Sequence, residues 1–523
     1  MASENESTNP GDIELLRIIL INYNRKNVID VTNLVGSFNF YESLFTSTCS
    51  CNFILMDATN VLSKIPMIGE EVAFFQYRTK GFKKDGEPYP VRQRSFRLYK
   101  ISDRVEAREG QTNYKVHGID DHYFINEAID VSASFVGQNC TLAANTVFNN
   151  FFIKTPPSLT PIDRFATLKG IGNEDVKESS NSSTFISPGI TPFEVIEHLK
   201  KEAQHKTLEN TSNYFFYQDI DGFHLTTLSE LKNQDTSFVY YVKDAATEDI
   251  SEQEEKKIDD TTTSVRNNII SYKIRKAYDT IKNLDQGLYG NRVVALDLLT
   301  KRFDENIFNY TSEWNNLSPI DSHKLISEDS LYAQVGSTQT RFITTELLTT
   351  SIDTGNPKFF SNSDQPSYKQ TPYFYPIDKE NPDLKKDKIA GTIDNKSADK
   401  RLLELVNNDP KIGNPRTKHL TLPKEVASIA TLDGLIIDVV VPGNSELKPG
   451  QKVELFIPEP KDEKGRYQLF MGNENPVFFV TDVRHAYLNA YGSYITTITC
   501  IKDSYNMSIE KVFESENEEL ADE

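Results

Sequence analysis

Three residues near the C-terminal end of the chain, Asp482, Arg484 and His485, have the types that acid–base chemistry uses. A histidine held beside a carboxylate can act as a general base. A stretch of similar pattern nearer the N-terminus carries Asp103 and Arg104, but a valine follows there in place of the histidine. Because only the Asp and Arg recur, we predict a structural pair near a strand end rather than a catalytic group.

Glu194 and His198 are a second candidate, because residues four positions apart on a helix share one face and could pair a carboxylate with a base. However, Thr191 and Glu194 have the spacing of a capping box, and Pro192 suits the first turn of a helix. We therefore predict that Glu194 caps a helix that begins here and that His198 is a surface residue.

The four cysteines, Cys49, Cys51, Cys140 and Cys500, are too few for a disulfide scaffold in a chain of this length. Cys49 and Cys51 would lie on the same face of a strand, as two metal ligands would. No second pair of Cys or His stands at ligand spacing, however. We predict buried free thiols.

The sequence lacks the short motifs of the common enzyme classes. It has no Gly-x-Ser-x-Gly elbow, no Walker loop and no His-Glu-x-x-His, and Gly170 and Gly172 lack the third glycine of a phosphate cradle. We therefore predict no catalytic residues, no cofactor and no metal, and a protein that is not an enzyme.

Length and composition set the limits within which these residues must be positioned. The chain has 523 residues, more than one hydrophobic core usually serves, so we expect three or four domains. Its apolar stretches are too short to span a bilayer, and its polar, acidic start predicts neither a secretory nor a mitochondrial signal. The net charge of -19 argues against a grip on nucleic acid, which needs clustered Lys and Arg.

A β-rich pattern occurs twice, once near each end of the chain. The expected strands are Asn52 to Asp57, Val72 to Tyr77, Phe96 to Ile101 and Tyr114 to Ile119 in the first copy, and Leu435 to Val441, Val453 to Pro458, Val477 to Val480 and Tyr494 to Ile501 in the second. The two copies stay in register to within one position over the length of a small domain. Turn residues between the strands favour an antiparallel barrel over βαβ units.

The segment between the two copies mixes helical and strand patterns. Residues 135–155 have apolar side chains at helical spacing, which predicts a buried helix. A second helix is expected to begin at Thr191. Residues 213–228 form two aromatic-rich runs around Asp219-Ile-Asp-Gly222, which predicts a hairpin with Gly222 at positive φ.

Residues 246–264 and 351–400 are polar and lack periodicity, so we predict loops or extended arms there. Lys369 to Asp378 carries three consecutive aromatic residues between prolines and is expected to lie along a neighbouring surface. Arg292 to Lys301 is a strand candidate, and Lys400 to Asn407 is expected to be a short helix.

These features predict a β-rich α+β multidomain protein with two similar tube-type antiparallel β-barrel domains, an intervening α/β portion and long loops. The expected divisions are 1–9, a disordered tail; 10–128, the first barrel; 129–236, a helical segment plus hairpin; 237–290, an acidic loop and linker; 291–420, a strand, extended arms and a short helix, part of which joins the second barrel; 421–505, the second barrel; and 506–523, an acidic tail.

The chain resembles the central baseplate hub protein of contractile-tailed bacteriophages of the T-even type. Four stretches carry the resemblance: Asn39 to Leu44 with Asn52 to Asp57, Ile65-Pro66 and Gly69 to Val72; Asp130 to Phe135; Ile186 to Leu199 with Asn213 to Tyr217 and Asp221 to Phe223; and Val441 to Gly443, Leu447, Gly450 and Val453 to Pro458 with Tyr494 to Asp503. The chain departs from the family in its long segments 246–264 and 305–415.

The resemblance implies a structural role in the virion, with assembly of the tail baseplate in the host cytoplasm. It implies a homotrimer whose six barrels adapt the sixfold tail tube to a threefold central spike, with 129–236 grasping the spike. The implied partners are the central spike protein, the tail tube or tube-initiator protein and baseplate wedge proteins, without membrane insertion.

The acidic composition suggests a negatively lined channel through which DNA passes without specific binding. Two alternatives remain open at this point. One is a hub component of a related contractile injection or secretion machine, and the other is a tail-associated enzyme that degrades the cell wall.

Overall fold

The computed structural model of the protein describes most of both repeated regions and of the segment between them. The described residues are 13–22, 27–80, 88–108, 110–153, 168–171, 174–179, 182–205, 212–242, 267–297, 302–321, 323–324, 326, 369–374, 418–457, 477–488 and 492–505. The predictions for the tails 1–9 and 506–523, the loop 246–264, the helix 400–407 and most of the arm 351–400 lie outside them.

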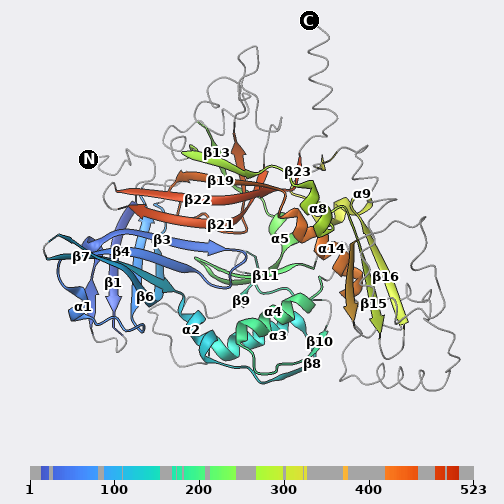
Figure 1. The fold of residues 1–523 in the computed structure, drawn as a ribbon, viewed down its shortest axis with the longest axis horizontal. Coiled ribbons are helices and arrows are strands. Elements are labelled where there is room, and N and C mark those ends of the chain that lie inside the picture. The colour runs from blue at the N-terminus through green and yellow to red at the C-terminus, as the bar shows by residue number, and fades with distance from the viewer. Residues whose placement is uncertain are drawn as a thin grey trace, which may run out of the picture.

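One large sheet joins the two repeated regions. It contains β1 (Ile13–Ile21), β2 (Val28–Asp30), β3 (Val35–Ser43), β4 (Ser50–Asp57), β5 (Val72–Thr79), β6 (Arg92–Arg108), β7 (Gln111–Ile119), β13 (Thr236–Tyr241), β14 (Ser271–Lys276), β19 (Leu435–Pro442), β20 (Lys452–Phe456), β21 (Val477–Leu488) and β22 (Ser493–Lys502). The strand order is β14-β19-β22-β21-β3-β4-β7-β6-β5-β1-β2, with β20 on β21 and β13 on β20. Strands from both ends of the chain therefore run side by side, red beside blue (Figure 1).

The two repeated regions have the same strand order. We name β3 to β7 the first module, and β14 with β19 to β22 the second module. The order is β3-β4-β7-β6-β5 in the first and β14-β19-β22-β21-β20 in the second, and every neighbouring pair is antiparallel. The predicted repeat is thereby confirmed as a repeat of strand order. The modules differ beyond this set, because β1 is antiparallel to β5 whereas β13 is parallel to β20.

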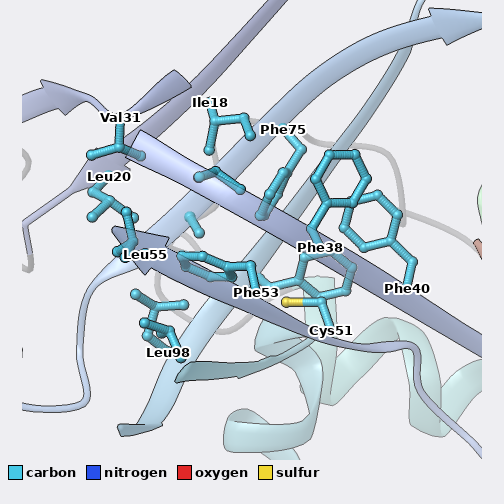
Figure 2. Close-up of a cluster of buried hydrophobic side chains, with 14 of the residues drawn as sticks. Ile18, Leu20, Val31, Phe38, Phe40, Cys51, Phe53, Leu55, Phe75 and Leu98 are labelled. Carbon is cyan, nitrogen blue, oxygen red and sulfur yellow. The ribbon is translucent and has the colours of Figure 1, made fainter. Parts of the chain in front are cut away.

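The sheet of the first module curls around an aromatic core (Figure 2). Alternate residues of each strand point inward, as expected for strands with one buried face. The Phe75 ring of β5 lies 5.5 Å from Phe38 and 5.1 Å from Phe40 of β3, although β5 and β3 share no hydrogen bonds. The second module has its own core, which includes Val439, Val453 and Ile498.

The segment between the modules forms a small α/β unit. Its elements are α2 (Asp121–Ala128), β8 (Ser134–Asn139), α3 (Cys140–Phe148), a π-helical turn at 149–153, β9 (Leu168–Lys169), β10 (Ser182–Ile186), α4 (Pro192–Glu202), β11 (Tyr214–Asp219), β12 (Gly222–Thr227) and α5 (Leu228–Lys232). The predicted hairpin is confirmed as β11 and β12, with Gly222 at φ 137°. The buried helix is shorter than predicted, because the first residues of 135–155 form β8.

The prediction of a linker at 237–290 is wrong for its described residues. Both β13 and β14 belong to the large sheet, where they pair with β20 and β19, and α8 (Thr280–Gln286) follows. The start of the second barrel domain also differs from the prediction, because the helix α14 (Lys418–Thr431) crosses residue 421 and the first strand begins at Leu435.

The remaining described elements form a second, smaller sheet and its neighbours. The smaller sheet consists of β15 (Gly290–Asp297), β16 (Arg302–Asn309) and β18 (Lys369–Phe374), and β17 (His323–Lys324) pairs separately with β23 (Ser504–Tyr505). α9 (Tyr310–Glu313) and a 3-10 turn at 314–317 follow β16. The first repeated region also contains a 3-10 turn at 32–34 and α1 (Val61–Lys64). The strand predicted at Arg292 to Lys301 is confirmed as β15. The aromatic arm near 369 is not free, because β18 pairs with β15 of the same chain.

Candidate assembly site at the junction of the two modules

The two modules are joined edge to edge by β3 and β21. Seven residue pairs align these strands antiparallel, from Asp482 opposite Ser43 to Leu488 opposite Ser37. The backbone N–H of Leu44 extends the ladder by donating to the Thr481 carbonyl at 3.0 Å. Because the pairing satisfies the edge of each module with the other, neither edge is left open here.

The junction is also a shared core. Tyr487 of β21 and Tyr494 of β22 are buried within the core of the first module. The Tyr487 ring stacks on Phe38 of β3 at 4.9 Å, and Tyr494 lies 6.4 Å from Tyr77 of β5 in an edge-on arrangement. Burial of such side chains contributes roughly 1.5–3 kcal/mol each. The two modules therefore share part of one hydrophobic core.

On the opposite, polar face of the sheet, side-chain amides bridge the junction. The Arg484 guanidinium donates to Asn39 Oδ1 at 2.8 and 3.0 Å and lies 5.9 Å from the centre of the Tyr41 ring. Asn39 in turn donates to Asn52 Oδ1 at 3.0 Å. Arg484 thus has its partner on the other module, and the local pairing with Asp482 that we predicted from the sequence is wrong.

The register of the sheet defines which residues correspond between the modules. Arg97 is paired with both Val72 and Ile119, and Phe479 is paired with both Lys452 and Ile501, so Arg97 and Phe479 are equivalent. Each strand has a β-bulge just beyond that residue, between Leu98 and Lys100 and between Val480 and Asp482. A bulge repeated at the same place is strong evidence of one fold used twice.

This register changes one expectation about the histidine near the C-terminus. His485 corresponds by count to Asp103, not to the valine that the sequence comparison placed there. His485 is fully buried, and its Nδ1 lies 2.9 Å from the Tyr494 hydroxyl. Burial, together with the charge of Arg94, holds its pKa well below the usual value. A neutral, enclosed imidazole of this kind is part of the core and not a general base for a substrate.

The other candidate residues also have structural roles. Glu194 and Thr191 form the predicted capping box, with Glu194 Oε2 accepting from the Thr191 backbone at 2.9 Å. The His198 ring stacks on Phe185 at 4.0 Å. The four cysteines are buried and free, as predicted, and burial raises the pKa of Cys49 well above the usual value.

A cleft of about 850 Å³ lies on the polar face beside the junction, between the strands and the helices α2 and α4. Its charged groups are engaged in contacts: Glu194 with Thr191, Glu197 with Lys200, Asp438 with Arg275, Arg484 with Asn39, and Glu127 with Asn126. No group of three or more metal-ligating side chains occurs in the described part of the chain.

The tip of the β11–β12 hairpin connects all three parts. Asp221 forms ion pairs with Arg92 at the start of β6, at 3.5 Å, and with Lys448 in the loop before β20. Asp219 accepts from the backbone of Asp221 at 2.7 Å and from His224 Nε2 at 2.9 Å. This network fixes the intervening α/β unit against both modules. Because Arg92, Asp221 and Lys448 are far apart in the chain, the sequence alone does not predict their contact.

The buried Asp219–His224 pair should make stability depend on pH. Burial alone would lower the pKa of His224, but the Asp219 charge and hydrogen bond outweigh it, so this pKa is raised; the pKa of Asp219 is lowered. The stability that the pair gains through His224 is fully present below the unfolded pKa of His, about 6.5, and is lost as pH rises through the folded pKa. The stability that it gains through Asp219 is present above the unfolded pKa of Asp, about 3.9, and is lost as pH falls through the folded pKa.

We therefore expect His224→Gln to lower the free energy of unfolding by roughly 1.5–3 kcal/mol between about pH 4 and 6.5, where the pair contributes most. Urea titrations at pH 6 and pH 9 would measure this loss, which should shrink at the higher pH. His117→Gln is the matched control, because that side chain lies on the surface of β7 and should show little change. An equal loss at both pH values would contradict the assignment.

In the described residues no helix has the length and apolar character that crossing a membrane requires.

No protein-family model and no curated protein matches this sequence. Solved structures show partial likeness. One is a tail protein from Neisseria meningitidis MC58, with 10% identity, coverage of 93% of this chain and 96% of that chain, and a TM-score of 0.41. Another is the 43 kDa tail protein of prophage MuSo2 from Shewanella oneidensis, with 10% identity, coverage of 93% and 98%, and a TM-score of 0.41. A third is the Francisella PdpA-VgrG complex, with 9% identity, coverage of 95% and 53%, and a TM-score of 0.38.

Proposed function

We propose that this protein is the structural hub of a phage tail baseplate. The observation that carries the proposal is the junction just described: one chain holds two modules of the same strand order, joined side by side by β3 and β21. A structural protein without a symmetry requirement would need only one such module per chain. Two modules joined through their edges are the unit from which a ring of alternating, nearly equivalent positions can be built.

Symmetry gives this arrangement its use. Three chains carry six modules, so a threefold assembly can present a nearly sixfold surface. In this proposal each module is a tube-type barrel, and the ring docks the sixfold tail tube, or its initiator, on one side and a threefold central spike on the other. The chain then functions as an adaptor, and its contribution is geometric rather than catalytic. The buried state of His485 supports that reading.

The intervening unit at 129–236 is proposed to grasp the spike. Its hairpin is anchored to both modules through Asp221, so a load on this unit would be passed to the ring. Baseplate wedge proteins are further proposed partners. The proposed location is the tail baseplate of the virion, with assembly in the host cytoplasm.

The polar face of the joined sheet is the proposed lining of a channel for DNA. Uncharged polar side chains on this face include Ser37, Asn39, Asn52, Thr497 and Thr499, all at least partly exposed. Such side chains offer no clustered positive charge to phosphates, so DNA would pass without being held. A negative lining stays a prediction, because charges of both signs, such as Arg484 and Asp482, occur on this face.

The decisive measurement is mass in solution, by light scattering after size exclusion, with and without the spike partner. We expect a species of three times the 59.5 kDa of one chain, alone or on addition of the spike. A chain that remains a monomer at micromolar concentration under both conditions would contradict the proposal. Activity on cell walls in a turnover assay would point instead to an enzyme.

A further inference from the structure

Several strand edges of the large sheet are open in the described residues, and two of them, on β14 and β6, belong to different modules. β14 is the terminal strand at one end of the sheet and pairs only with β19. β6 pairs with β7 along most of its length, but its other edge is covered by β5 only as far as Arg97. Beyond Leu98, the remainder of that edge of β6 meets no described strand.

These two open edges are the counterparts of the two edges that meet at the junction. Residues paired across the sheet form the row Phe38–Phe53–Val116–Ile101 in the first module and the row Tyr272–Val439–Ile498–Val483 in the second. The open strand β14 is thus equivalent to β3. The open half of β6 is equivalent to the half of β21 that pairs with β3.

Exposure of apolar side chains supports this equivalence. At the junction Phe38 and Phe40 are 0% exposed, because Tyr487 and the rest of the shared core cover them. Their counterparts on β14, Tyr272 and Ile274, are 40% and 37% exposed. The open edge of β14 therefore carries apolar side chains of the kind that the junction buries in the first module, and no described strand covers them.

We propose that β14 of one chain pairs antiparallel with the open half of β6 of a second copy of the same chain, so that the contact between chains copies the β3–β21 junction within a chain. The inference rests on the proposed trimer and names the surfaces that close it. Because the two edges differ, the contact is head to tail, and repeating it produces a ring.

Charge favours β6 over a second β14 as the partner of β14. β14 carries Lys273, Arg275 and Lys276, and the open half of β6 carries the carboxylates Asp103 and Glu106 together with Lys100, Arg104 and Arg108. Opposite charges on facing strands stabilise a sheet by roughly 0.2–1 kcal/mol per pair. A contact of β14 with β14 would place only basic residues against each other.

One difference between the two edges affects the register. β6 has further irregularities between Ser102 and Val105 and between Glu106 and Arg108, with Asp103 at φ 53°, whereas β21 is regular after its bulge. Such bulges protect an exposed edge from pairing indiscriminately. They also shift the facing residue by about one position, so the test uses two neighbouring registers.

Disulfide trapping tests the contact directly. The variants Glu106→Cys/Tyr272→Cys and Val105→Cys/Tyr272→Cys place thiols at the pair equivalent to Tyr487/Phe38 in the two registers, the first taken from the β6–β7 pairing and the second from the residue count. Mild oxidation should yield covalent dimers and closed trimers on a non-reducing gel for at least one of the two. The native cysteines are buried and need not be removed. Ser37→Cys/Leu488→Cys is the positive control, which should form a disulfide within one chain. Glu106→Cys/Val28→Cys is the negative control, which should form no cross-link because its second thiol lies on the unrelated edge of β2.

A second variant separates this inference from the proposed function. Tyr272→Asp should leave the far-ultraviolet circular dichroism spectrum unchanged and convert the trimer to monomer, while Val28→Asp, at a side chain that is 49% exposed, should leave the trimer intact. A wild-type trimer that neither cross-links in either register nor dissociates in Tyr272→Asp would overturn the β6–β14 contact and leave the hub proposal standing. A wild type that stays monomeric both with and without the spike partner would overturn both.

Discussion

Replacing Arg94 with methionine should destabilise the protein by about 3–5 kcal/mol, the usual cost of removing one partner from a buried ion pair. Arg94 on β6 forms an ion pair with Glu42 on β3, and the two side chains are 5% and 0% exposed. Arg94 Nε also donates to the Tyr77 hydroxyl at 3.1 Å, and its guanidinium lies 5.0 Å from the Phe40 ring centre. The variant would leave the Glu42 carboxylate enclosed without its cation.

The loss should depend on pH. Burial already raises the pKa of Glu42, and Arg94 opposes this effect. Without Arg94 the carboxyl group should bind a proton in the folded state. A raised folded pKa gives stability that is present below the unfolded pKa of about 4.3 and is lost as pH rises through the folded value. The defect of Arg94→Met should therefore be smaller at pH 4.5 than at pH 7.5 in urea titrations.

Two further variants control this experiment. Arg275→Met removes a cation from a more exposed pair with Asp438, where a loss of only about 0–1 kcal/mol is expected. Arg94→Met combined with Glu42→Leu removes both charges and should recover most of the stability. If the double variant were no more stable than the single one, packing against Phe40 and Tyr77 would account for the effect in place of the ion pair.

Four strands of each module and the cap of the helix at Thr191 could be predicted from the sequence because their signals are local. Alternating apolar residues identified β4, β5, β6 and β7 and their counterparts in the second module. The Thr191–Glu194 capping box and the glycine at position 222 each depend on a few adjacent residues, and the structure confirms both. The repeat itself was visible because the spacing of strands and turns is kept when a fold is used twice.

The strands β13 and β14 could not be predicted, because their signal depends on residues far away in the chain. β14 is paired with β19, more than 150 positions later, and five of its six residues are exposed. A strand without a buried face shows no alternation of apolar and polar residues. Its neighbourhood in the sequence is polar, so the sequence predicts a linker there.

The junction between the modules was missed for a related reason. Aligning the turns of the two copies places His485 opposite a valine, which is wrong because the loops of the two copies differ in length. Only the sheet register corrects this, since it counts from paired strands. The partner of Arg484 lies at Asn39, which is 445 positions away. One signal in the sequence does point to the junction. Tyr487 and Tyr494 are large aromatic residues that continue the inward faces of β21 and β22 beyond the residues that form the core of the second module, so they need a further core to pack against.

Gly443→Ala should be the second severe substitution, with a loss of roughly 2–4 kcal/mol. A Cβ atom at this position would overlap the ring of Tyr494. The backbone cannot easily move away, because the Gly443 N–H donates to the Tyr494 carbonyl at 2.8 Å and the next N–H donates to Thr496 Oγ1 at 3.0 Å. The ring is also confined, since its hydroxyl lies 2.9 Å from His485 Nδ1.

The damage from Gly443→Ala should reach the first module, because Tyr494 is part of the core shared across the junction. Thermal unfolding followed by circular dichroism would measure the loss, and tyrosine fluorescence would report on the displaced ring. Gly36→Ala is the matched control: its Cβ would meet only the flexible side chain of Met56, which can move, so a small change is expected. Equal effects of the two substitutions would show that Tyr494 is not held as tightly as the argument requires, and that the two modules are joined mainly by the β3–β21 ladder.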